Sequence, residues 1–416
     1  MGLIAVVGGG PAGMMAALAA ARAGARVVLL EKNPGLGQKL LLTGNGRCNL
    51  TNQADLQTLV ANMPGNGRFL HSALARFGPA ELRGLLASLG VPTVVEEDGR
   101  VFPASNRARD VQAALLRALR QAGVDIRTSS PVVALHMENG CMGGVRAGGR
   151  VLACRAVILA TGGLSYPETG CTGDGYRLAG AAGHRVEPPR ASLVPLVTAE
   201  GWTHALPGLA LDDAGLRLSI EGRALGSARD ALLFTHDGVS GPAVLRLSRA
   251  AVPALAQGAV LALAIDLAPS MDLQGLDAVL RAAIAANARR GLGKALAAAG
   301  LIPASLAAAL PAAIGIEPRE PAGCLGRSRR LELCRALKAL PLTVTGAYPL
   351  QKAVVTAGGV AVAGVDPATM ASRLVPGLYF AGELLDVDGY TGGFNLQAAF
   401  STGHAAGRAA AAHAGV

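Results

Sequence analysis

The N-terminal segment alternates short apolar runs with one helical pattern. The apolar run 3–7 ends in glycines, residues 11–24 place apolar and small residues at helical spacing, and residues 26–32 contain a second apolar run. Short apolar runs bounded by glycine are typical of buried strands. The sequence therefore predicts a strand–helix–strand opening, which is a βαβ unit.

The next part of the chain changes from helices to strands. Residues 55–123 have mainly helical spacing, with an extended interruption at 91–105. Residues 124–155 alternate apolar and polar positions, as half-buried strands do, and residues 156–163 contain a fully apolar run before a glycine turn. This pattern predicts that the first cofactor-binding segment ends near residue 190.

A different pattern follows Pro188 and Pro189. Residues 192–222 and 259–267 indicate antiparallel strands, whereas residues 272–340 are rich in Ala, Leu and Arg and indicate helices interrupted by prolines. Glycine-rich, strand-like sequence returns after residue 341. We therefore expect an α/β protein with a Rossmann-like domain that is split by an inserted domain with a β-rich and a helical part. The expected boundaries are 1–190, 191–340 and 341–416.

Composition favours a cytoplasmic protein without metal or membrane segments. Hydrophobic residues make up 51% of the chain, but no uninterrupted apolar run is long enough to span a bilayer. The N-terminus lacks the basic region of a signal peptide and continues directly into a glycine motif. The six cysteines show no CxxC spacing, so we expect reduced thiols and neither a disulfide framework nor a metal site.

The charge is strongly positive. A formal net charge of +10 suggests a polyanionic partner, because basic side chains gain affinity by displacing counterions from phosphates. The excess of Arg over Lys and the abundance of Ala would also follow from a GC-rich genome. Charge alone therefore leaves nucleic-acid binding as one of two explanations.

A dinucleotide-binding motif follows the first predicted strand. Gly8, Gly10 and Gly13 have G-x-G-x-x-G spacing, with Pro11 and Ala12 at the start of the helix. The first glycine permits a tight turn, the second lets a pyrophosphate approach the backbone, and the third allows close helix–strand packing. Glu31 and Lys32 close the second strand, where an acidic side chain accepts ribose hydroxyls.

The C-terminal segment resembles that of FAD-binding proteins of the glutathione-reductase type. An apolar strand precedes Gly382 and Glu383, and a glycine turn precedes a helix that begins near Gly393. The resemblance implies that Glu383 contacts the ribityl chain and that the helix start faces the flavin pyrimidine. The residues expected at this helix start are Gly393, Phe394, Asn395 and Leu396.

Two further observations concern the cofactor. Thr161 and Gly162 follow the apolar run at 156–159 and would return beneath the cofactor, although an ordinary strand end would look the same. A second G-x-G-x-x-G motif after a strand is absent from the sequence. We therefore expect FAD as the resident cofactor, and NADH or NADPH as a transient electron donor.

The stretch "KLLLTGNGRCNLTN", residues 39–52, follows Glu31 and should run along the cofactor towards the flavin ring. Small hydrogen-bonding residues suit this path, so Lys39, Thr43 and Gly44 are candidate cofactor contacts. Arg47 could pair with a phosphate, the flavin or an anionic substrate. Cys48 could contact the flavin and donate a proton beside the ring, or could be a small buried filler.

Four motifs together resemble one bacterial flavoprotein family over essentially the whole chain. They are "TGNGRCNLTN", "FTHDGVSGP", "VTAGGV" and "GLYFAGELLDVDGYTGGFNLQAAFSTG". The family comprises BaiN-type, aminoacetone-oxidase-like proteins and includes the FAD-dependent dihydrouridine synthase of large-subunit ribosomal RNA. The resemblance implies an NAD(P)H-driven reductase. A small-molecule ene-reductase or amine oxidase, and a non-enzymatic flavin-carrying redox or assembly protein, are the alternatives, because a fold does not specify a substrate.

Two segments of the inserted domain are candidates for substrate contact. His236, in the loop 234–242, is a second candidate acid, or else an ordinary exposed polar residue. The basic segment 318–338 could face ribosomal RNA through Arg327, Arg329 and Arg330, together with Arg47, or could be a solvated helix face. Its other basic residues are Arg319, Arg335 and Lys338.

Overall fold

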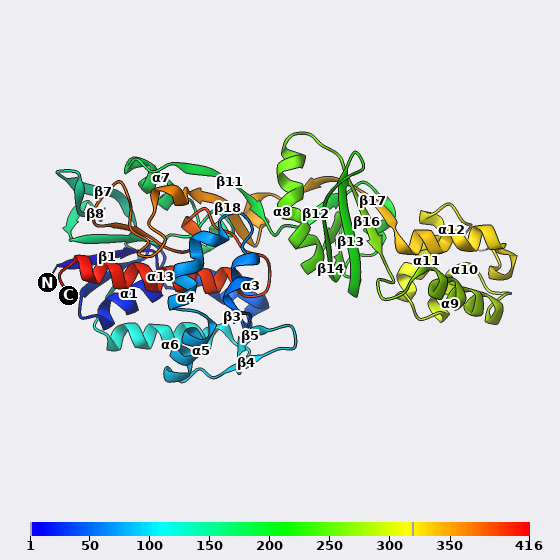
Figure 1. Cartoon of the computed structure of the whole chain (residues 1–416), viewed down its shortest axis with the longest axis horizontal. Helices are drawn as coiled ribbons and strands as arrows, with labels where there is room; N and C mark the ends of the chain where they lie inside the picture. The colour runs from blue at the N-terminus through cyan, green and yellow to red at the C-terminus, as the bar shows by residue number, and fades with distance from the viewer. Residues whose placement is uncertain (1, 318–319) are drawn as a thin grey trace. The chain divides into compact units, whose positions relative to one another are not determined.

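The computed structural model describes residues 2–317 and 320–416 (Figure 1). The chain forms two compact units, one comprising the residues up to Ala191 together with Leu350–Val416, the other Ser192–Pro349. This arrangement confirms the α/β class and the split Rossmann-type domain. Arg319 lies outside the described residues.

A parallel five-stranded sheet forms the centre of the first unit, in the order β19-β10-β1-β2-β6. Its inner strands are almost wholly buried, as expected of parallel strands covered on both faces. The order reverses between β1 and β10, and ligands of open α/β sheets bind at the carboxyl ends of strands at such a switch point. The strands are β1 (Leu3–Val7), β2 (Arg26–Leu30), β6 (Asp125–Arg127), β10 (Ala156–Leu159) and β19 (Leu378–Phe380).

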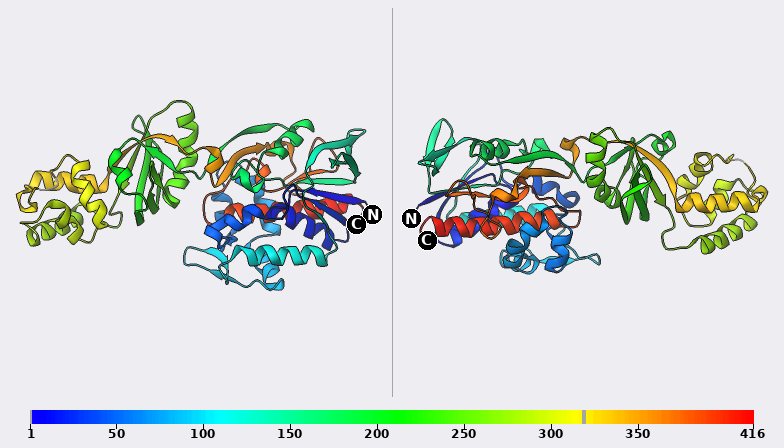
Figure 2. Two further views of the ribbon diagram at one scale, coloured as in Figure 1. Left: turned by 180° about the vertical axis from the view of Figure 1, so that it is seen from behind. Right: turned by 45° about the horizontal axis from the view of Figure 1, so that its top comes forward.

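Helices α1 (Pro11–Arg22) and α13 (Phe394–His413) lie side by side against this sheet, as Figures 1 and 2 show in blue and red. Glycines allow this close approach. A Cβ at Gly403 would lie 2.3 Å from the Ala12 carbonyl oxygen, and one at Gly407 would lie 2.2 Å from that of Ala16. The remaining helices of the unit are α2 (Gln38–Leu42), α3 (Leu56–Ala61), α4 (His71–Arg76), α5 (Pro79–Ser88), α6 (Ala108–Gln121) and α7 (Asp174–Ala181).

Three small sheets complete the first unit. Two have three strands, in the orders β3-β5-β4 and β7-β8-β9, and one has two strands, β11-β18. Among them, the two-residue strand β3 ends the stretch 39–52 and contacts α13. The strands are β3 (Thr51–Asn52), β4 (Thr93–Val95), β5 (Arg100–Pro103), β7 (Val132–Glu138), β8 (Cys141–Ala147), β9 (Arg150–Ala153), β11 (Val186–Ser192) and β18 (Val355–Val360).

The second unit combines a closed barrel with a group of helices. The barrel order is β12-β15-β14-β13-β16-β17. In β16, the buried residues Leu261, Leu263 and Ile265 alternate with more exposed ones, so that one face of the strand packs in the core. Its elements are β12 (Leu196–Thr198), β13 (Ala210–Ile220), β14 (Arg223–Phe234), β15 (Gly238–Ser240), α8 (Pro242–Ala256), β16 (Leu261–Asp266) and β17 (Leu340–Ala347). The helices, drawn in yellow tones in Figure 2, are α9 (Leu273–Ala286), α10 (Leu292–Ala298), α11 (Ala304–Ala313) and α12 (Arg327–Lys338).

The boundary expected at 340/341 differs from the one observed. Strand β17 pairs with β12 and β16 and so closes the barrel, and the second unit therefore extends to Pro349. The other boundary lies at Ala191/Ser192, next to the expected 190/191. Among the described residues, none of the helices has the length and apolar character needed to cross a lipid bilayer.

Candidate functional site

The three motif glycines have distinct geometries at the end of β1. Gly8 has a φ of +103°, and a Cβ there would lie 2.5 Å from the Ala160 carbonyl oxygen of the neighbouring strand end. A Cβ at Gly13 would lie 1.8 Å from the Gly8 carbonyl oxygen, whereas one at Gly10 would meet nothing within 4 Å. Gly8 and Gly13 are therefore required by the turn and by packing. Gly10, by contrast, faces open space before α1, where Pro11 takes the first helical position and Ala12 is buried.

The side chain of Glu31 closes the turn at the end of β2. Its Oε2 accepts a hydrogen bond from the Gly9 amide at 2.7 Å, and its Oε1 accepts one from the Asn33 amide at 2.8 Å. The carboxylate is buried and next to the glycine motif, as an adenosine-ribose ligand would require. Lys32 instead pairs with Asp174, 2.6 Å away, and donates to the Thr172 hydroxyl.

Glu383 lies in a half-buried polar network after the end of β19. Lys39 Nζ donates to Glu383 Oε2 at 2.7 Å and to the Ser165 hydroxyl at 2.6 Å. Glu383 Oε1 accepts from the Thr356 amide at 2.8 Å and from the Ser165 hydroxyl at 3.1 Å. These three partners of Glu383 come from separate parts of the chain and hold the carboxylate in one orientation. Gly382 precedes it with a φ of +73°, which a residue with a side chain rarely adopts.

The start of α13 is built for close backbone approach. Gly393, its N-cap, has a φ of +94°, and a Cβ there would lie 2.3 Å from the Thr51 carbonyl oxygen. With its amide oriented to satisfy its neighbours, Asn49 accepts a hydrogen bond from the Gly393 amide and donates one to Thr51. Asn395 fixes the preceding loop, because its amide exchanges 2.8 Å hydrogen bonds with the backbone of Gly389. Phe394 is buried and Leu396 is half-buried.

The turn after β10 carries an unsatisfied hydroxyl. Thr161 Oγ1 is buried without a hydrogen-bond partner among the described residues, and so is the hydroxyl of Tyr176. Gly162 follows with a φ of +74°, and a Cβ there would lie 3.1 Å from Cys171 Sγ. Buried polar atoms without partners are uncommon in proteins, and a bound polar group would supply what Thr161 lacks.

These features lie at one edge because all the strands are parallel. Gly8, Glu31, Thr161 and Glu383 follow the carboxyl ends of four of the five strands, across the switch point between β1 and β10. Open space above Gly10, the Glu31 carboxylate, the half-buried Glu383 and the helix start at Gly393 fit a flavin adenine dinucleotide. Gly10 and the α1 N-terminus would hold its pyrophosphate, Glu31 its ribose, and Glu383 its ribityl chain.

The stretch after α2 forms an unusual left-handed turn. Gly44 and Asn45 have φ values of +57° and +55°, and Thr43 donates its hydroxyl to the Leu40 carbonyl at 2.7 Å. The Arg47 guanidinium stacks 4.0 Å from the centre of the Phe102 ring, pairs with Glu96 and donates to Asn106. The charge of Arg47 is therefore neutralised by the carboxylate of Glu96 within its own unit. A phosphate could pair with Arg47 only if this ion pair opened.

Cys48 is completely buried in the core of the first unit and has a φ of +64°. Burial raises the pKa of its thiol to about 12, against the smaller opposite effect of a hydrogen bond with Thr43. A direct acid must touch the substrate or the flavin, and no surface of this side chain is accessible. The geometry therefore favours the small-filler interpretation of Cys48 over the catalytic one.

The candidate residues of the second unit differ in their environments. His236 is exposed in the loop between β14 and β15, next to Asp237, whose carboxylate accepts a 3.0 Å hydrogen bond from the Tyr348 hydroxyl. Arg330 and Arg329 are engaged in ion pairs, with Asp277 at 2.7 Å and with Glu320 at 3.0 Å. Arg327 is exposed and has no ion pair among the described residues. The three arginines proposed as one RNA contact are therefore not equivalent.

Sequence reasoning missed several residues around the predicted cofactor contacts. Ser165, Thr356 and Asn49 hold Lys39, Glu383 and the Gly393 amide, respectively. Asn49 lies within the stretch 39–52, so that motif could have indicated it as a residue near the cofactor. Ser165 and Thr356 have no local signature, because the partners they meet are distant in sequence.

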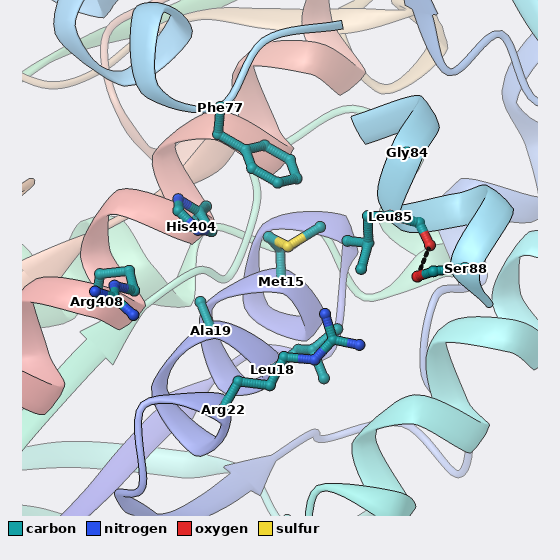
Figure 3. A pocket seen from close by; sticks show the side chains of 10 residues that line it. All are labelled: Met15, Leu18, Ala19, Arg22, Phe77, Gly84, Leu85, Ser88, His404 and Arg408. Carbon is teal, nitrogen blue, oxygen red and sulfur yellow. Dashed lines mark hydrogen bonds between the residues drawn. The ribbon is translucent and has the colours of Figure 1, made fainter. Parts of the chain in front are cut away.

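A separate groove of about 380 Å³ lies along the C-terminal half of α1 (Figure 3). Met15, Leu18 and Phe77 form its apolar wall, while Arg22 and Arg408 stand at its edge. The His404 ring stacks on Phe77 with centroids 4.5 Å apart. Since the cofactor edge is at the opposite end of α1, this groove is not part of the candidate site.

Comparison with known proteins identifies related sequences over the full chain. Residues 3–409 match the family model described as HI0933-like protein Rossmann domain. A 3-dehydro-bile acid delta(4,6)-reductase of Clostridium scindens is 35% identical, over 99% of each chain. A ribosomal RNA dihydrouridine synthase of Escherichia coli is 32% identical over 95% of each chain, and one of Haemophilus influenzae is 32% identical over 96% of each.

Solved structures with the same fold are more distant in sequence. The 3-ketosteroid delta1-dehydrogenase of Sterolibacterium denitrificans matches with a TM-score of 0.55 at 16% identity, covering 98% of this chain and 99% of its own. The 3-ketosteroid-delta4-(5alpha)-dehydrogenase of Rhodococcus jostii matches with a TM-score of 0.54 at 17% identity, covering 99% and 96%. At these identities the likeness establishes the fold alone.

Proposed function

We propose, since this chain belongs to the HI0933-like Rossmann-domain family of FAD-dependent oxidoreductases, that it reduces a uridine of large-subunit ribosomal RNA to 5,6-dihydrouridine. The observation that carries the choice of substrate is the concentration of positive charge in the helical part of the second unit. Ten basic and five acidic residues lie between 272 and 338, which supplies five of the ten net positive charges of the chain. Two relatives named ribosomal RNA dihydrouridine synthase support the same substrate.

The residues of the first unit would bind and orient the cofactor. When bound and reduced by NADH or NADPH, FAD supplies the hydride that saturates the C5–C6 bond of the uracil. Glu383, held by Lys39, Ser165 and Thr356, would accept a hydrogen bond from a ribityl hydroxyl without having to reorient. The N-terminus of the long helix α13 would stabilise negative charge on the pyrimidine side of the ring.

The chain must also supply a proton at uracil C5 and hold the base outside its stack. His236 is our first candidate for the acid, since its side chain is exposed and that of Cys48 is buried. Taking a base out of a helix costs a few kcal/mol, and less in a folded or partly assembled RNA. Contacts to the RNA backbone would help to offset that cost.

A second candidate function is the reduction of a conjugated carbon–carbon bond in a small molecule. The 35% identical relative is named as a bile-acid reductase, and the same cofactor edge would serve either substrate. A third possibility, a flavin-carrying protein without turnover, predicts that no electron donor is consumed.

One experiment separates these functions. The purified, FAD-loaded protein is given NADH or NADPH and, in parallel, ribosomal RNA that lacks dihydrouridine or an unsaturated 3-oxo bile acid. Nucleoside mass spectrometry should detect dihydrouridine in the RNA reaction. Reduction of the steroid with no dihydrouridine would reject the proposal, and so would the absence of turnover with both substrates.

A further inference from the structure

The helical part of the second unit contains two classes of basic side chain. Arg330 pairs with Asp277 at 2.7 Å, Arg329 with Glu320 at 3.0 Å, and Lys338 with Asp266 at 2.6 Å. The Arg330 pair is largely shielded from solvent and joins α12 to α9. These cations are neutralised locally, so they add little to the electrostatic field outside the protein.

Six other basic side chains of this part are exposed and form neither an ion pair nor a side-chain hydrogen bond among residues 2–317 and 320–416. One of them, Arg335, lies in the last turn of α12. We call the other five the basic rim; it consists of Arg281, Arg289, Arg290, Lys294 and Arg327. Their charges are uncompensated by direct contacts. A ligand phosphate could therefore bind them without first breaking a protein ion pair.

The basic rim is brought together by the antiparallel packing of α9 and α12, which Figure 1 shows side by side. The Asp277–Arg330 pair marks one point along this packing, and the 2.9 Å hydrogen bond from the Gly323 amide to the Ala288 carbonyl marks another. Arg281 lies one turn after Asp277 in α9, and Arg327 lies one turn before Arg330 in α12. Both therefore fall between these two points, where the helices run in opposite directions.

The other members of the basic rim lie at the end of the same packing. Arg289 and Arg290 directly follow Ala288, and the Arg290 carbonyl accepts a 2.8 Å hydrogen bond from the Ala322 amide. Lys294 is in the first turn of α10, whose first residue, Leu292, bonds to the Glu320 carbonyl. These backbone bonds fix the turn between α9 and α10 against the segment that leads into α12.

The position of Arg327 opposes helix stability. It begins α12, where the positive end of the helix dipole favours acidic residues, and the first turn contains none. The N-cap, Gly326, also provides no side-chain hydrogen bond to the free amides. An arginine in this place is unfavourable for folding, so binding of an anion is the simpler reason for it.

We propose that the basic rim binds the phosphate backbone of the RNA substrate, and that Arg329 and Arg330 are structural. This inference rests on the proposed function and adds the surface that holds the RNA. Phosphate contacts of this kind orient a nucleic acid without reading its sequence. The choice of uridine would then depend on RNA shape and on the flavin site.

The test compares charge-matched variants of the full-length, FAD-loaded protein. The first variant carries Arg289→Gln, Arg290→Gln and Arg327→Gln. The control carries Arg22→Gln, Arg26→Gln and Arg120→Gln, which are exposed arginines of the first unit without ion pairs among the described residues. Binding of large-subunit ribosomal RNA and of a fluorescein-labelled single-stranded oligoribonucleotide is measured by anisotropy over a range of salt concentrations.

For single-stranded RNA, each lost phosphate contact reduces the slope of log K against log salt by about 0.7, so the first variant should lose about two units of slope. The control and Arg329→Gln should keep the wild-type slope. An unchanged slope in the first variant, or an equal loss in the control, would overturn the assignment of the RNA-binding surface. The proposed function would still be supported in that case if the wild type forms dihydrouridine. If the wild type neither binds RNA nor forms dihydrouridine, both proposals fail.

The melting temperature and the rate of flavin reduction by NAD(P)H provide the check on folding. Both should be the same in the wild type and in the first variant, because the three replaced side chains make no ion pair with any residue that the structure describes. A triple variant that also loses its flavin or its melting transition is replaced by the single variants Arg289→Gln and Arg327→Gln. Each folded single variant should lose about 0.7 units of slope. A wild-type slope in both would overturn the proposal.

Discussion

The glycines of the first motif should respond in opposite ways to alanine substitution. At Gly10 the added Cβ meets nothing within 4 Å, and the backbone is extended with a φ of −76°. Gly10→Ala should therefore change the free energy of unfolding of the cofactor-free protein by less than about 1 kcal/mol. The same methyl group would fill the space that the pyrophosphate needs.

The expected loss of FAD affinity follows from overpacking. Forcing a methyl group into an occupied contact typically costs about 1–3 kcal/mol, which corresponds to a dissociation constant raised roughly 5- to 150-fold. Titration of the apoprotein with FAD, followed by flavin fluorescence, measures it directly. An unchanged dissociation constant for Gly10→Ala would refute the placement of the pyrophosphate at this glycine.

Two controls separate cofactor binding from folding. Gly13→Ala would place a Cβ 1.8 Å from the Gly8 carbonyl oxygen, so it should lower the free energy of unfolding of the apoprotein itself, by at least about 1–3 kcal/mol. Gly180 is exposed in α7, and a Cβ there would meet nothing within 4 Å. Gly180→Ala should therefore raise the free energy of unfolding of the apoprotein by about 0.5–1 kcal/mol. Urea denaturation without FAD measures both.

Three further predictions concern Glu383 and Cys48. Glu383→Gln should weaken FAD binding and lower the free energy of unfolding by about 1–3 kcal/mol, since it leaves the half-buried Lys39 without its carboxylate. Scanning fluorimetry with and without FAD would show this, and an unchanged affinity would remove Glu383 from the site. Cys48→Ala should keep FAD and most dihydrouridine formation, whereas loss of turnover with full FAD occupancy would restore Cys48 as the acid. Burial raises the Cys48 pKa from 9.0 to about 12, so the folded thiol keeps a proton that the unfolded chain loses. The free energy of unfolding should therefore fall as pH rises between these values, and it should fall less in Cys48→Ala. Identical pH profiles would contradict the burial of the thiol.

The cofactor edge could be predicted because its residues follow strand ends. Gly8, Glu31 and Glu383 each come directly after or near a short apolar run, and parallel strands bring their carboxyl ends to one edge. The network around Glu383 could not be predicted, because Ser165 and Thr356 are far from it in the sequence. Their residue types are common in any loop, so only the folded chain identifies them.

The features of the second unit that could not be predicted have the same cause. Strand β17 alternates apolar and exposed residues like any other strand, and only its pairing with β12 and β16 assigns it to the barrel. Similarly, Arg330 and Arg327 belong to one basic segment, but the partner of Arg330 is Asp277, 53 residues earlier. Which arginine is neutralised depends on the packing of α9 and α12, and composition contains no information about that.

The proposed modification of ribosomal RNA can be tested in cells. Nucleoside and fragment mass spectrometry is applied to large-subunit ribosomal RNA from a strain lacking the gene and from the same strain expressing the wild-type chain or Gly10→Ala. We expect one dihydrouridine to disappear on deletion, to return fully with the wild-type chain and to return less with Gly10→Ala. Unchanged dihydrouridine in the deletion strain would contradict the proposed function and direct attention to a small-molecule substrate.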